Sequence, residues 1–300
     1  MQKTDGMNYA PVYMGKCTPV CRAGEFKFAV IGLDHGHVFA MCNGLLEAGA
    51  TLVSVYDRDE NKSRDFAARY KNVKIAASSE DILADRDVAL VVSASVPHER
   101  FALGKRVLSA GKDYFVDKPG MLSLTEIEAA ENLCAETGRK YIVYYGERIH
   151  VEGAVYAQQL INEGRIGRVL HMDILAPHRL NKSTRPAWFF DKRLNGGIIT
   201  DIGSHQIEQF LDFAGARTAK VLFAQVINYA NGDKQNFYDF GQGNLLADNG
   251  ATCYFRVDWF TPPGLSAWGD GRVFIIGDKG TLELRKYLDV GVSTKGDQVI

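Results

Sequence analysis

Lys118 is the first residue whose type and position could do chemistry. It lies in the segment Tyr114–Gly120 (YFVDKPG), between an apolar run and a helical pattern that starts at Ser123. We therefore expect it in the turn that follows a strand. Ligands of open α/β sheets bind outside the carboxyl ends of the strands, and Pro119 biases Lys118 away from helical backbone. An ordinary loop with a solvated lysine has the same pattern, so these residues alone leave both interpretations open.

Asp201 and His205 form the second candidate group. They lie four residues apart in a predicted helix over 198–213, directly after Gly196-Gly197. Residues at this spacing share one helix face, and a nearby carboxylate can hold an imidazole ready as a base near neutral pH. However, Glu208 and Asp212 continue the same face, which is also the pattern of an amphipathic helix with a polar outer stripe. Periodicity alone favours that second interpretation.

The third candidate is a nucleotide-binding turn at residues 32–37 (GLDHGH), between a predicted strand over 26–31 and a helix over 38–48. A glycine turn before a helix N-terminus suits a pyrophosphate, and an acid after the next strand suits ribose hydroxyls. Asp57 fits that role and favours NAD, while Arg58 leaves room for NADP. A strict G-x-G-x-x-G pattern would have glycine at Asp34 and His37, and a carboxylate beside a pyrophosphate is repulsive. A flavodoxin-like domain without a nucleotide therefore remains an alternative.

The candidate cofactor contacts come from the ends of four predicted strands. They are Gly32, Leu33, His35, Gly36, His37, Asp57, Arg58, Ala94, Ser95, Asp117 and Lys118.

Two domains are expected from the order of the elements. Apolar runs alternate with helical patterns from residue 26 to residue 145, which predicts a Rossmann doubly wound parallel sheet. After a helix over 153–162, strands follow one another at 167–177, 219–228, 251–260, 272–276 and 281–284. That pattern predicts an α/β domain with an open, mainly antiparallel sheet. We expect an irregular arm over 1–24, an NAD(P)-binding domain over 25–147 and a substrate and oligomerisation domain over 148–300.

The segment 177–190 mixes hydrogen-bond donors with aromatic side chains, as a polyol-binding wall would. A surface loop with inward-packed aromatics fits the same residues, and Arg148 shares this ambiguity. The candidate substrate contacts are Arg148, His178, Arg179, Lys182 and Trp188.

Composition narrows the class of protein. Lys+Arg 35 against Asp+Glu 36 leaves a net charge of −1, so no basic stripe suggests nucleic acid or a membrane surface. No apolar run is long enough for a membrane helix and no secretory signal is visible. The five scattered cysteines indicate reduced thiols in a cytoplasmic protein rather than a disulfide framework or metal site. We expect no metal.

Together these motifs resemble the glucose–fructose oxidoreductase / inositol dehydrogenase (Gfo/Idh/MocA) family, from about residue 25 to the end. Members carry Glu-Lys-Pro where this chain has Asp117-Lys118-Pro119, and an Ala-Gly-Lys before that strand, here residues 110–112. They also carry a Gly-rich segment followed by Asp and His four apart, here 196–205, and Gly-x-Ile-Gly, here 164–167. The order and spacing of four motifs are far more specific than any one of them.

The resemblance implies a Rossmann domain, a second domain whose sheet forms a homo-oligomer interface in a dimer or tetramer, and a catalytic group. In that group Lys118 touches substrate and nicotinamide, and His205 with Asp201 handles the proton. The chain departs from the family in its first turn, in Val96 and Arg100 where members often have Pro and His, and in its earlier end, which suggests a truncated C-terminus.

We therefore expect an NAD(P)-dependent oxidoreductase that moves a hydride between a sugar or polyol alcohol and nicotinamide. A base near pKa 7 suits the hydroxyl proton, and a cation suits the charge that develops on oxygen. Two alternatives keep the fold. One is an NAD-dependent enzyme that cleaves a glycosidic bond through transient oxidation, and the other is a non-catalytic NAD and sugar sensor.

Overall fold

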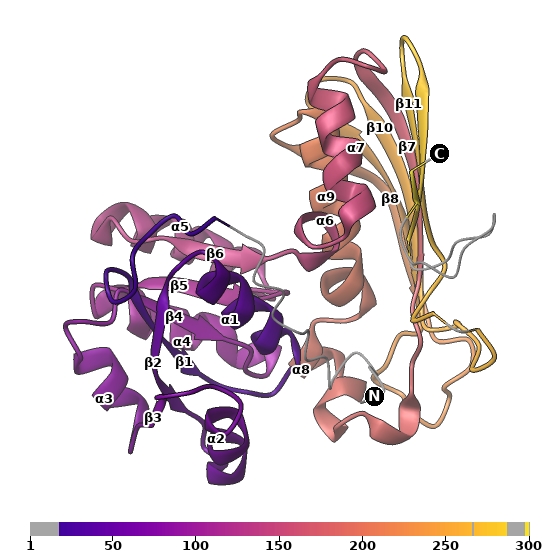
Figure 1. Cartoon of the computed structure of the whole chain (residues 1–300). Coiled ribbons are helices and arrows are strands. Elements are labelled where there is room, and N and C mark those ends of the chain that lie inside the picture. Colours follow the sequence, from indigo (N-terminus) through magenta and orange to yellow (C-terminus); the bar gives the residue numbers. More distant parts are fainter. Residues whose placement is uncertain (1–17, 266, 287–297, 300) are drawn as a thin grey trace. The chain divides into compact units, whose positions relative to one another are not determined.

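The computed structural model describes residues 18–265, 267–286 and 298–299. Most of the predicted arm over 1–24, together with Cys17, lies outside the described residues. The chain divides into two compact units, Met1–Tyr144 and Tyr145–Ile300. Figure 1 colours the first unit from indigo to magenta and the second from rose to yellow.

The first unit is built on a six-stranded sheet in the order β3-β2-β1-β4-β5-β6, in which every paired neighbour is parallel. Its strands are β1 (Lys27–Ile31), β2 (Thr51–Tyr56), β3 (Lys74–Ile75), β4 (Leu90–Ser93), β5 (Asp113–Asp117) and β6 (Tyr141–Tyr144). This confirms the predicted Rossmann sheet. The order reverses between β1 and β4, and such a switch point is where open α/β sheets bind ligands.

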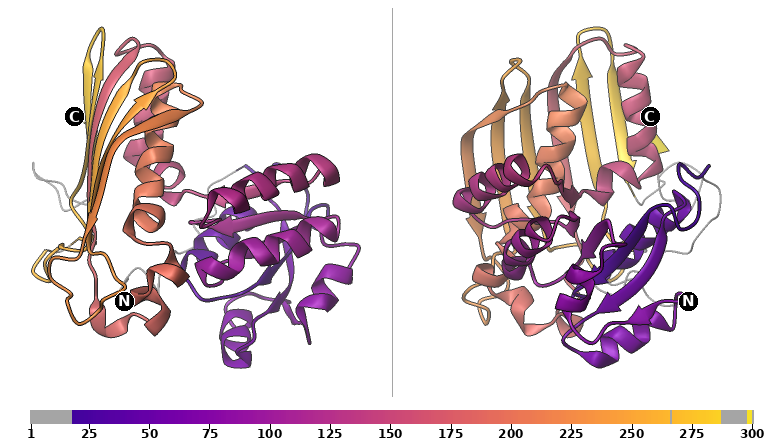
Figure 2. Two further views of the ribbon diagram at one scale, coloured as in Figure 1. Left: turned by 180° about the vertical axis from the view of Figure 1, so that it is seen from behind. Right: turned by 90° about the vertical axis from the view of Figure 1, so that its left-hand side faces the viewer.

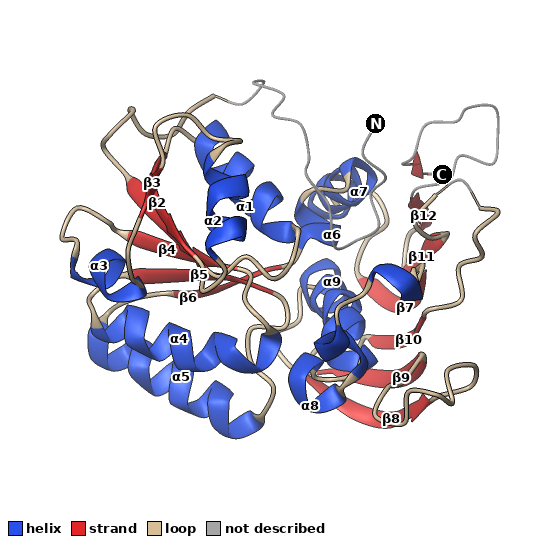
Figure 3. Ribbon diagram, turned by 90° about the horizontal axis from the view of Figure 1, so that it is seen from below, coloured by secondary structure: helices blue, strands red, loops and turns tan. Residues whose placement is uncertain are grey.

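Helices cover both faces of this sheet. They are α1 (His37–Glu47), α2 (Glu60–Ala67), α3 (Ser79–Ala84), α4 (Pro97–Ser109) and α5 (Leu124–Thr137). Figure 3 shows α1 and α2 on one face and α3, α4 and α5 on the other. One buried cluster includes Met41 and Phe66 from the first pair, and a second includes Leu103 and Val107 from α4. Two apolar faces covered in this way make the sheet doubly wound.

The second unit contains a seven-stranded sheet in the order β13-β12-β11-β7-β10-β9-β8. Its strands are β7 (Val169–Pro177), β8 (Ala219–Ile227), β9 (Phe240–Ala247), β10 (Thr252–Asp258), β11 (Gly271–Gly277), β12 (Thr281–Lys286) and β13 (Gln298–Val299). Among the described strands of this second sheet, only β7 and β10 pair in parallel. The prediction of a mainly antiparallel sheet is therefore confirmed.

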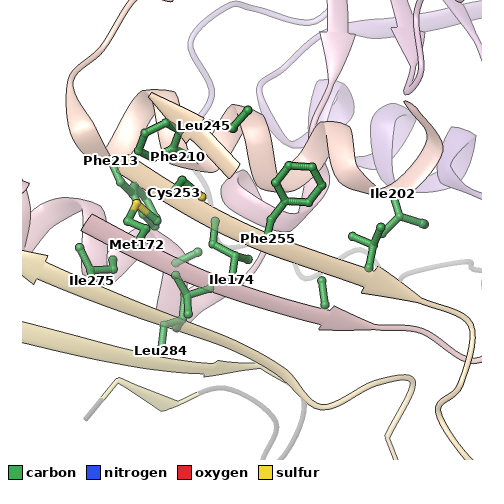
Figure 4. Packing of buried hydrophobic residues seen from close by; sticks show 14 of the residues in the cluster. Met172, Ile174, Ile202, Phe210, Phe213, Leu245, Cys253, Phe255, Ile275 and Leu284 are labelled. Atoms are coloured by element: carbon green, nitrogen blue, oxygen red, sulfur yellow. The ribbon is translucent and has the colours of Figure 1, made fainter. Parts of the chain in front are cut away.

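Short and long helices accompany this second sheet. They are α6 (Gly146–Ile149), α7 (Glu152–Asn162), α8 (Lys192–Asn195), the π-helical turn η3 (Ile199–Gly203) and α9 (Ser204–Ala214), with 3-10 turns η1 (Lys182–Thr184) and η2 (Ala187–Phe190). Among the described elements, helices lie against one face of the sheet (Figures 1 and 2). Figure 4 shows the core on that face, where Phe210 and Phe213 of α9 meet Met172, Ile174 and Phe255 of the strands.

Strand β9 was not predicted, because two glycines interrupt its apolar pattern. The structure explains these glycines: a Cβ on Gly243 would lie 2.8 Å from a ring carbon of Phe255, and one on Gly241 would lie 2.9 Å from a side-chain carbon of Ile199. Contacts under 3.0 Å are essentially never seen for real Cβ atoms. Close packing against neighbouring side chains thus requires glycine at two positions of β9. These glycines interrupt the apolar alternation by which a strand is recognised.

Within the described residues, no helix is long and apolar enough to cross a membrane. The cysteines that the structure describes, Cys21, Cys42, Cys134 and Cys253, are all free thiols.

Candidate functional site

The turn after β1 makes a close backbone approach to the turn after β4. Gly32 has φ +88°, and a Cβ there would lie 2.7 Å from Cβ of Ser95. The N–H of Asp34 donates to the carbonyl of Ala94 at 3.0 Å, and the N–H of Ala94 donates to the carbonyl of Gly32 at 3.1 Å. Only glycine fits Gly32 without strain. The turn leads directly into α1, and the positive end of a helix dipole favours an anion.

Asp57 is fixed at the end of β2 by the same turn. The side chain is 9% exposed. Its carboxylate accepts the N–H of Leu33 at 2.7 Å and the N–H of Asp59 at 2.9 Å. An ionised carboxylate has about four acceptor sites, so it can also accept ribose hydroxyls. Arg58 forms an ion pair with Glu99 at 2.8 Å. The guanidinium that could have bound the 2′-phosphate of NADP is therefore already paired.

Lys62 of α2 neutralises the carboxylate that made the turn look unsuitable for a pyrophosphate. Its Nζ lies 2.5 Å from Oδ1 of Asp34. Burial lowers the pKa of Lys62, but the hydrogen bond and charge of Asp34 outweigh burial and raise it. Sequence reasoning missed Lys62 because the two residues are 28 positions apart.

The side chain of Asp117 occupies the centre of a buried polar cluster at the end of β5. It is 0% exposed, and the guanidinium of Arg100 on α4 lies 3.1 Å from Oδ2. Nδ1 of His37 lies 2.8 Å from Oδ1, and Nδ1 of His35 lies 3.2 Å from Oδ2. The backbone N–H of Lys118 also donates to Oδ1, at 2.8 Å. The Lys118–Pro119 peptide bond is cis.

Two ionisable groups of this cluster have pKa values well below their ordinary ones, for different physical reasons. Burial raises the pKa of Asp117, but the charges of His37 and Arg100 outweigh burial and hold that pKa well below its usual range. Burial, helped by the charge of His37, lowers the pKa of His35 well below its ordinary value. Asp117 is therefore ionised and His35 neutral at pH 7.

His205 is buried within the second unit, at 3% exposure. Its ring meets the ring of Tyr145 edge-to-face at 5.8 Å. Asp201 lies in the π-helical turn η3, a rare backbone form that is frequent at functional sites. The interpretation of this helix face as a solvent-exposed polar stripe is therefore wrong at His205.

Arg148 covers the continuation of that face. Its guanidinium lies 2.6 Å from Glu208 and 3.4 Å from Asp212. The short helix α6, which sequence reasoning missed, carries Arg148 and brings it to α9. Arg148 on α6 thus pairs with both acidic residues of this face of α9.

The side chains of segment 177–190 already have partners within the second unit. Arg179 donates to the carbonyl oxygens of Pro262 at 3.2 Å and Ala267 at 2.8 Å, and also to that of Leu265. Lys182 pairs with Asp233 at 2.5 Å. Trp188 packs against the core as a partly buried side chain.

His178 belongs to a buried pair that sequence reasoning did not find. Its Nε2 lies 3.2 Å from Oε1 of Glu147, while its Nδ1 lies 3.0 Å from the carbonyl oxygen of Ala176. Oε2 of Glu147 accepts the amide of Gln206 at 2.9 Å, and all three side chains are buried. Glu147 had no recognisable signal, because it falls between the predicted strand and helix rather than inside either.

Two family models cover most of the chain. Residues 26–145 match the oxidoreductase family with an NAD-binding Rossmann fold, and residues 154–283 match the GFO/IDH/MocA C-terminal domain. The chain belongs to the GFO/IDH/MocA oxidoreductase family. The resemblance inferred from the four motifs is thereby confirmed.

Two relatives with named substrates share about a quarter of their residues with this chain. A dehydrogenase of Comamonas testosteroni that acts on 1-carboxy-3-chloro-3,4-dihydroxycyclohexa-1,5-diene is 26% identical over 65% of this chain and 49% of its own length. D-xylose dehydrogenase of Paenarthrobacter nicotinovorans is 26% identical over 49% of this chain and 39% of its own length. The chain thus spans about half or less of the length of these relatives.

Solved structures agree with the fold. A crystal structure of a protein from Erwinia carotovora atroseptica SCRI1043, described as an oxidoreductase, has a TM-score of 0.87 and 44% identity, covering 92% of this chain and 85% of that chain. GenD2 from gentamicin A biosynthesis, solved in complex with NAD, has a TM-score of 0.78 at 22% identity, covering 92% and 76%. At that identity the second likeness shows the fold alone.

His35→Gln should make the protein less sensitive to acid. In the unfolded chain His35 takes up a proton near its ordinary pKa of 6.5, whereas in the folded protein it does not. As the pH falls below 6.5 the unfolded state binds more protons, so the free energy of unfolding decreases by up to about 1.4 kcal/mol per pH unit from this residue. Urea unfolding followed by circular dichroism from about pH 7.5 to 5 should show a shallower decline for the variant. Equal slopes for both proteins would contradict the depressed pKa.

Proposed function

We propose that this protein is an NAD(P)-dependent oxidoreductase that transfers a hydride between a secondary alcohol of a sugar or polyol and nicotinamide. The observation that carries the proposal is the anchoring of Lys118. Its backbone is held at the carboxyl end of β5, the edge at which sheets of this class bind ligands, by a fully buried carboxylate. An ordinary surface loop does not need such an anchor.

The residues of the first unit fit the cofactor. Gly32 leaves space where a Cβ would collide, the N-terminus of α1 follows the turn, and the Asp57 carboxylate is fixed beside it. The turn would hold the pyrophosphate and Asp57 the ribose. Bound nicotinamide supplies the hydride acceptor. The pairing of Asp34 with Lys62 compensates the negative charge that made a flavodoxin-like domain without a nucleotide an alternative.

The proposed chemistry divides between two charges. An alcohol that loses a hydride also loses its hydroxyl proton, and its oxygen gains negative charge on the way. Lys118 would stabilise that oxygen as a cation, and His205 would accept the proton, oriented by Asp201. Arg148, His178, Arg179, Lys182 and Trp188 remain proposed substrate contacts.

The substrate class is supported by the relatives. The names of both relatives specify a hydroxyl-bearing substrate, D-xylose in one and a dihydroxy ring in the other. A panel of sugars and polyols screened for NAD reduction therefore tests the proposal. Absence of NAD reduction with every compound, by a protein that binds NADH, would contradict it.

Lys118→Ala should lower kcat by about 10²–10³-fold, because removal of one donor at a developing oxyanion typically slows a reaction by that factor. NADH affinity should stay nearly unchanged. The effect falls on the transition state rather than the ground state. Lys118→Arg should not restore the rate, since its planar guanidinium is larger and hydrated differently. Steady-state kinetics and a fluorescence titration with NADH measure the two quantities. A kcat near the wild-type value in Lys118→Ala would reduce the lysine to a loop residue.

His205→Ala provides the matched comparison. It should also lose rate, but raising the pH should recover part of the loss, because hydroxide can replace a base and cannot replace a cation. The measurement is kcat against pH for both variants. Recovery in neither variant, or in both, would mean that the two roles are wrongly divided.

The protein should bind NADH more tightly than NADPH. Asp57 would accept ribose hydroxyls and repel a 2′-phosphate. Asp57→Asn keeps an acceptor for the N–H of Leu33 but removes the negative charge. The ratio of NADPH to NADH dissociation constants should therefore decrease. Fluorescence titration with both cofactors tests this, and tighter binding of NADPH to the wild type would reject the assignment.

We expect the second unit to mediate self-association into a dimer or tetramer. The edge strand β8 exposes Val221 at 65%, Leu222 at 61% and Phe223 at 47%, and apolar sheet surfaces of this kind are usually covered. Leu222→Lys should shift the light-scattering mass toward the monomer at micromolar concentration. Leu124→Lys is the matched control, because Leu124 is 77% exposed on α5 of the first unit. A monomeric wild type would contradict the expectation.

A further inference from the structure

Asp117 has no accessible surface with which to contact a ligand. Both of its carboxylate oxygens are engaged: Oδ1 by His37 and the backbone N–H of Lys118, and Oδ2 by Arg100. The side chain is 0% exposed. Its role beside Lys118 must therefore act through neighbouring residues rather than through direct contact with cofactor or substrate.

Arg100 also holds the backbone around Lys118. Besides the carboxylate, its Nη1 donates to the carbonyl oxygens of Asp117 at 3.0 Å and Pro119 at 3.1 Å, which lie on either side of Lys118. Its Nε donates to the carbonyl of Ser95 at 2.7 Å. Arg100 is 1% exposed, so no water competes for these bonds. One buried guanidinium thus holds the backbone on both sides of the lysine.

The two histidines connect this anchor to the nucleotide turn. His37 is the first residue of α1 and stands where a strict G-x-G-x-x-G pattern has its last glycine, whose usual role is close packing of helix and strand. Here an imidazole spans that space and reaches Asp117. Nδ1 of His35, two residues earlier, accepts the backbone N–H of His37 at 3.2 Å and lies 3.2 Å from Oδ2 of Asp117.

We propose that Asp117 and Arg100 are positioning residues for Lys118, and that His35 and His37 couple the nucleotide turn to the lysine loop so that the two move as one. This inference deepens the proposed function, because it rests on Lys118 as the catalytic cation. Binding of a cofactor in the turn would then order the lysine loop as well.

The neutral state of His35, whose pKa burial depresses, supports the geometry. A neutral imidazole in this position adds no further positive charge to the cluster. His35, His37 and Asp117 each offer one atom that could bind a metal, and these atoms lie within 4.8 Å of one another. The guanidinium at 3.1 Å from the shared carboxylate favours hydrogen bonding over a divalent cation, because two unshielded positive charges would meet there.

The test uses the full chain and a readout independent of any substrate. Hydrogen–deuterium exchange of peptides covering 113–120 is measured with and without NADH in the wild type, Asp117→Asn, His37→Ala and His37→Asn. In His37→Asn the amide nitrogen can take the place of Nδ1, so the contact with Asp117 survives. Asp239→Asn is the control, because Asp239 is equally buried at 0% and caps the N–H groups of Tyr229 and Ala230 in the second unit.

In the wild type we expect NADH to slow exchange in 113–120 at least tenfold. That protection should be lost in His37→Ala and Asp117→Asn, and kept in His37→Asn and Asp239→Asn. NADH affinity is titrated in parallel, so that exchange is compared at equal saturation. Kinetics at saturating NAD should follow the same order, with kcat rather than KM reduced.

Three results would overturn the proposal. Protection retained in His37→Ala would show that the turn and the lysine loop are independent. Equal loss in His37→Ala and His37→Asn, accompanied by weaker NADH binding and unchanged kcat, would make His37 a simple cofactor contact. One equivalent of metal in the wild type by elemental analysis, absent in His37→Ala, would make the cluster a metal site. A wild type without dehydrogenase activity would refute the proposed function, while the exchange data would still decide the coupling.

Discussion

The organisation of the first unit depends on one desolvated charge, the carboxylate of Asp117. Removing one partner from a buried ion pair costs about 3–5 kcal/mol, because the other charge stays uncompensated. Asp117 avoids that cost through Arg100 from α4, His37 at the start of α1 and the N–H of Lys118. Each of these partners comes from a different part of the sheet edge. The requirement to satisfy one buried charge therefore brings the turn after β1, the end of β5 and the start of α4 to one place.

Departures from a local rule in this chain are compensated by residues distant in the sequence. Asp34 breaks the glycine pattern of the turn, and Lys62 on the next helix neutralises it. Arg148 likewise satisfies the acidic stripe of α9 from α6. These compensations use charge pairing across elements, which a reading of one motif at a time cannot detect. They also show why an imperfect fingerprint is compatible with a cofactor site.

Most of the architecture could be predicted because its signals are local. The strand predicted over 26–31 and the helix predicted over 38–48 agree with β1 and α1 to within one residue at each end. Ser123 caps α5 and Gly138, with φ 67°, ends it, and both residue types are strong boundary signals. The failures have physical causes of the opposite kind. Tertiary packing against Phe255 and Ile199 required the glycines that concealed β9, and α6 is a single turn too short for periodicity to reveal.

The sequence by itself determined the family, the two sheets and the candidate residues Lys118, Asp201 and His205, since motif order and hydrophobic periodicity are properties of the chain alone. Only the tertiary structure decided which of the polar residues are buried and with what partners. The only sequence signal at Arg100 was that family members often have His there. Yet Arg100 is among the most buried charged side chains described. The reason is that burial and charge compensation depend on neighbours contributed by distant segments, and folding alone brings those segments together.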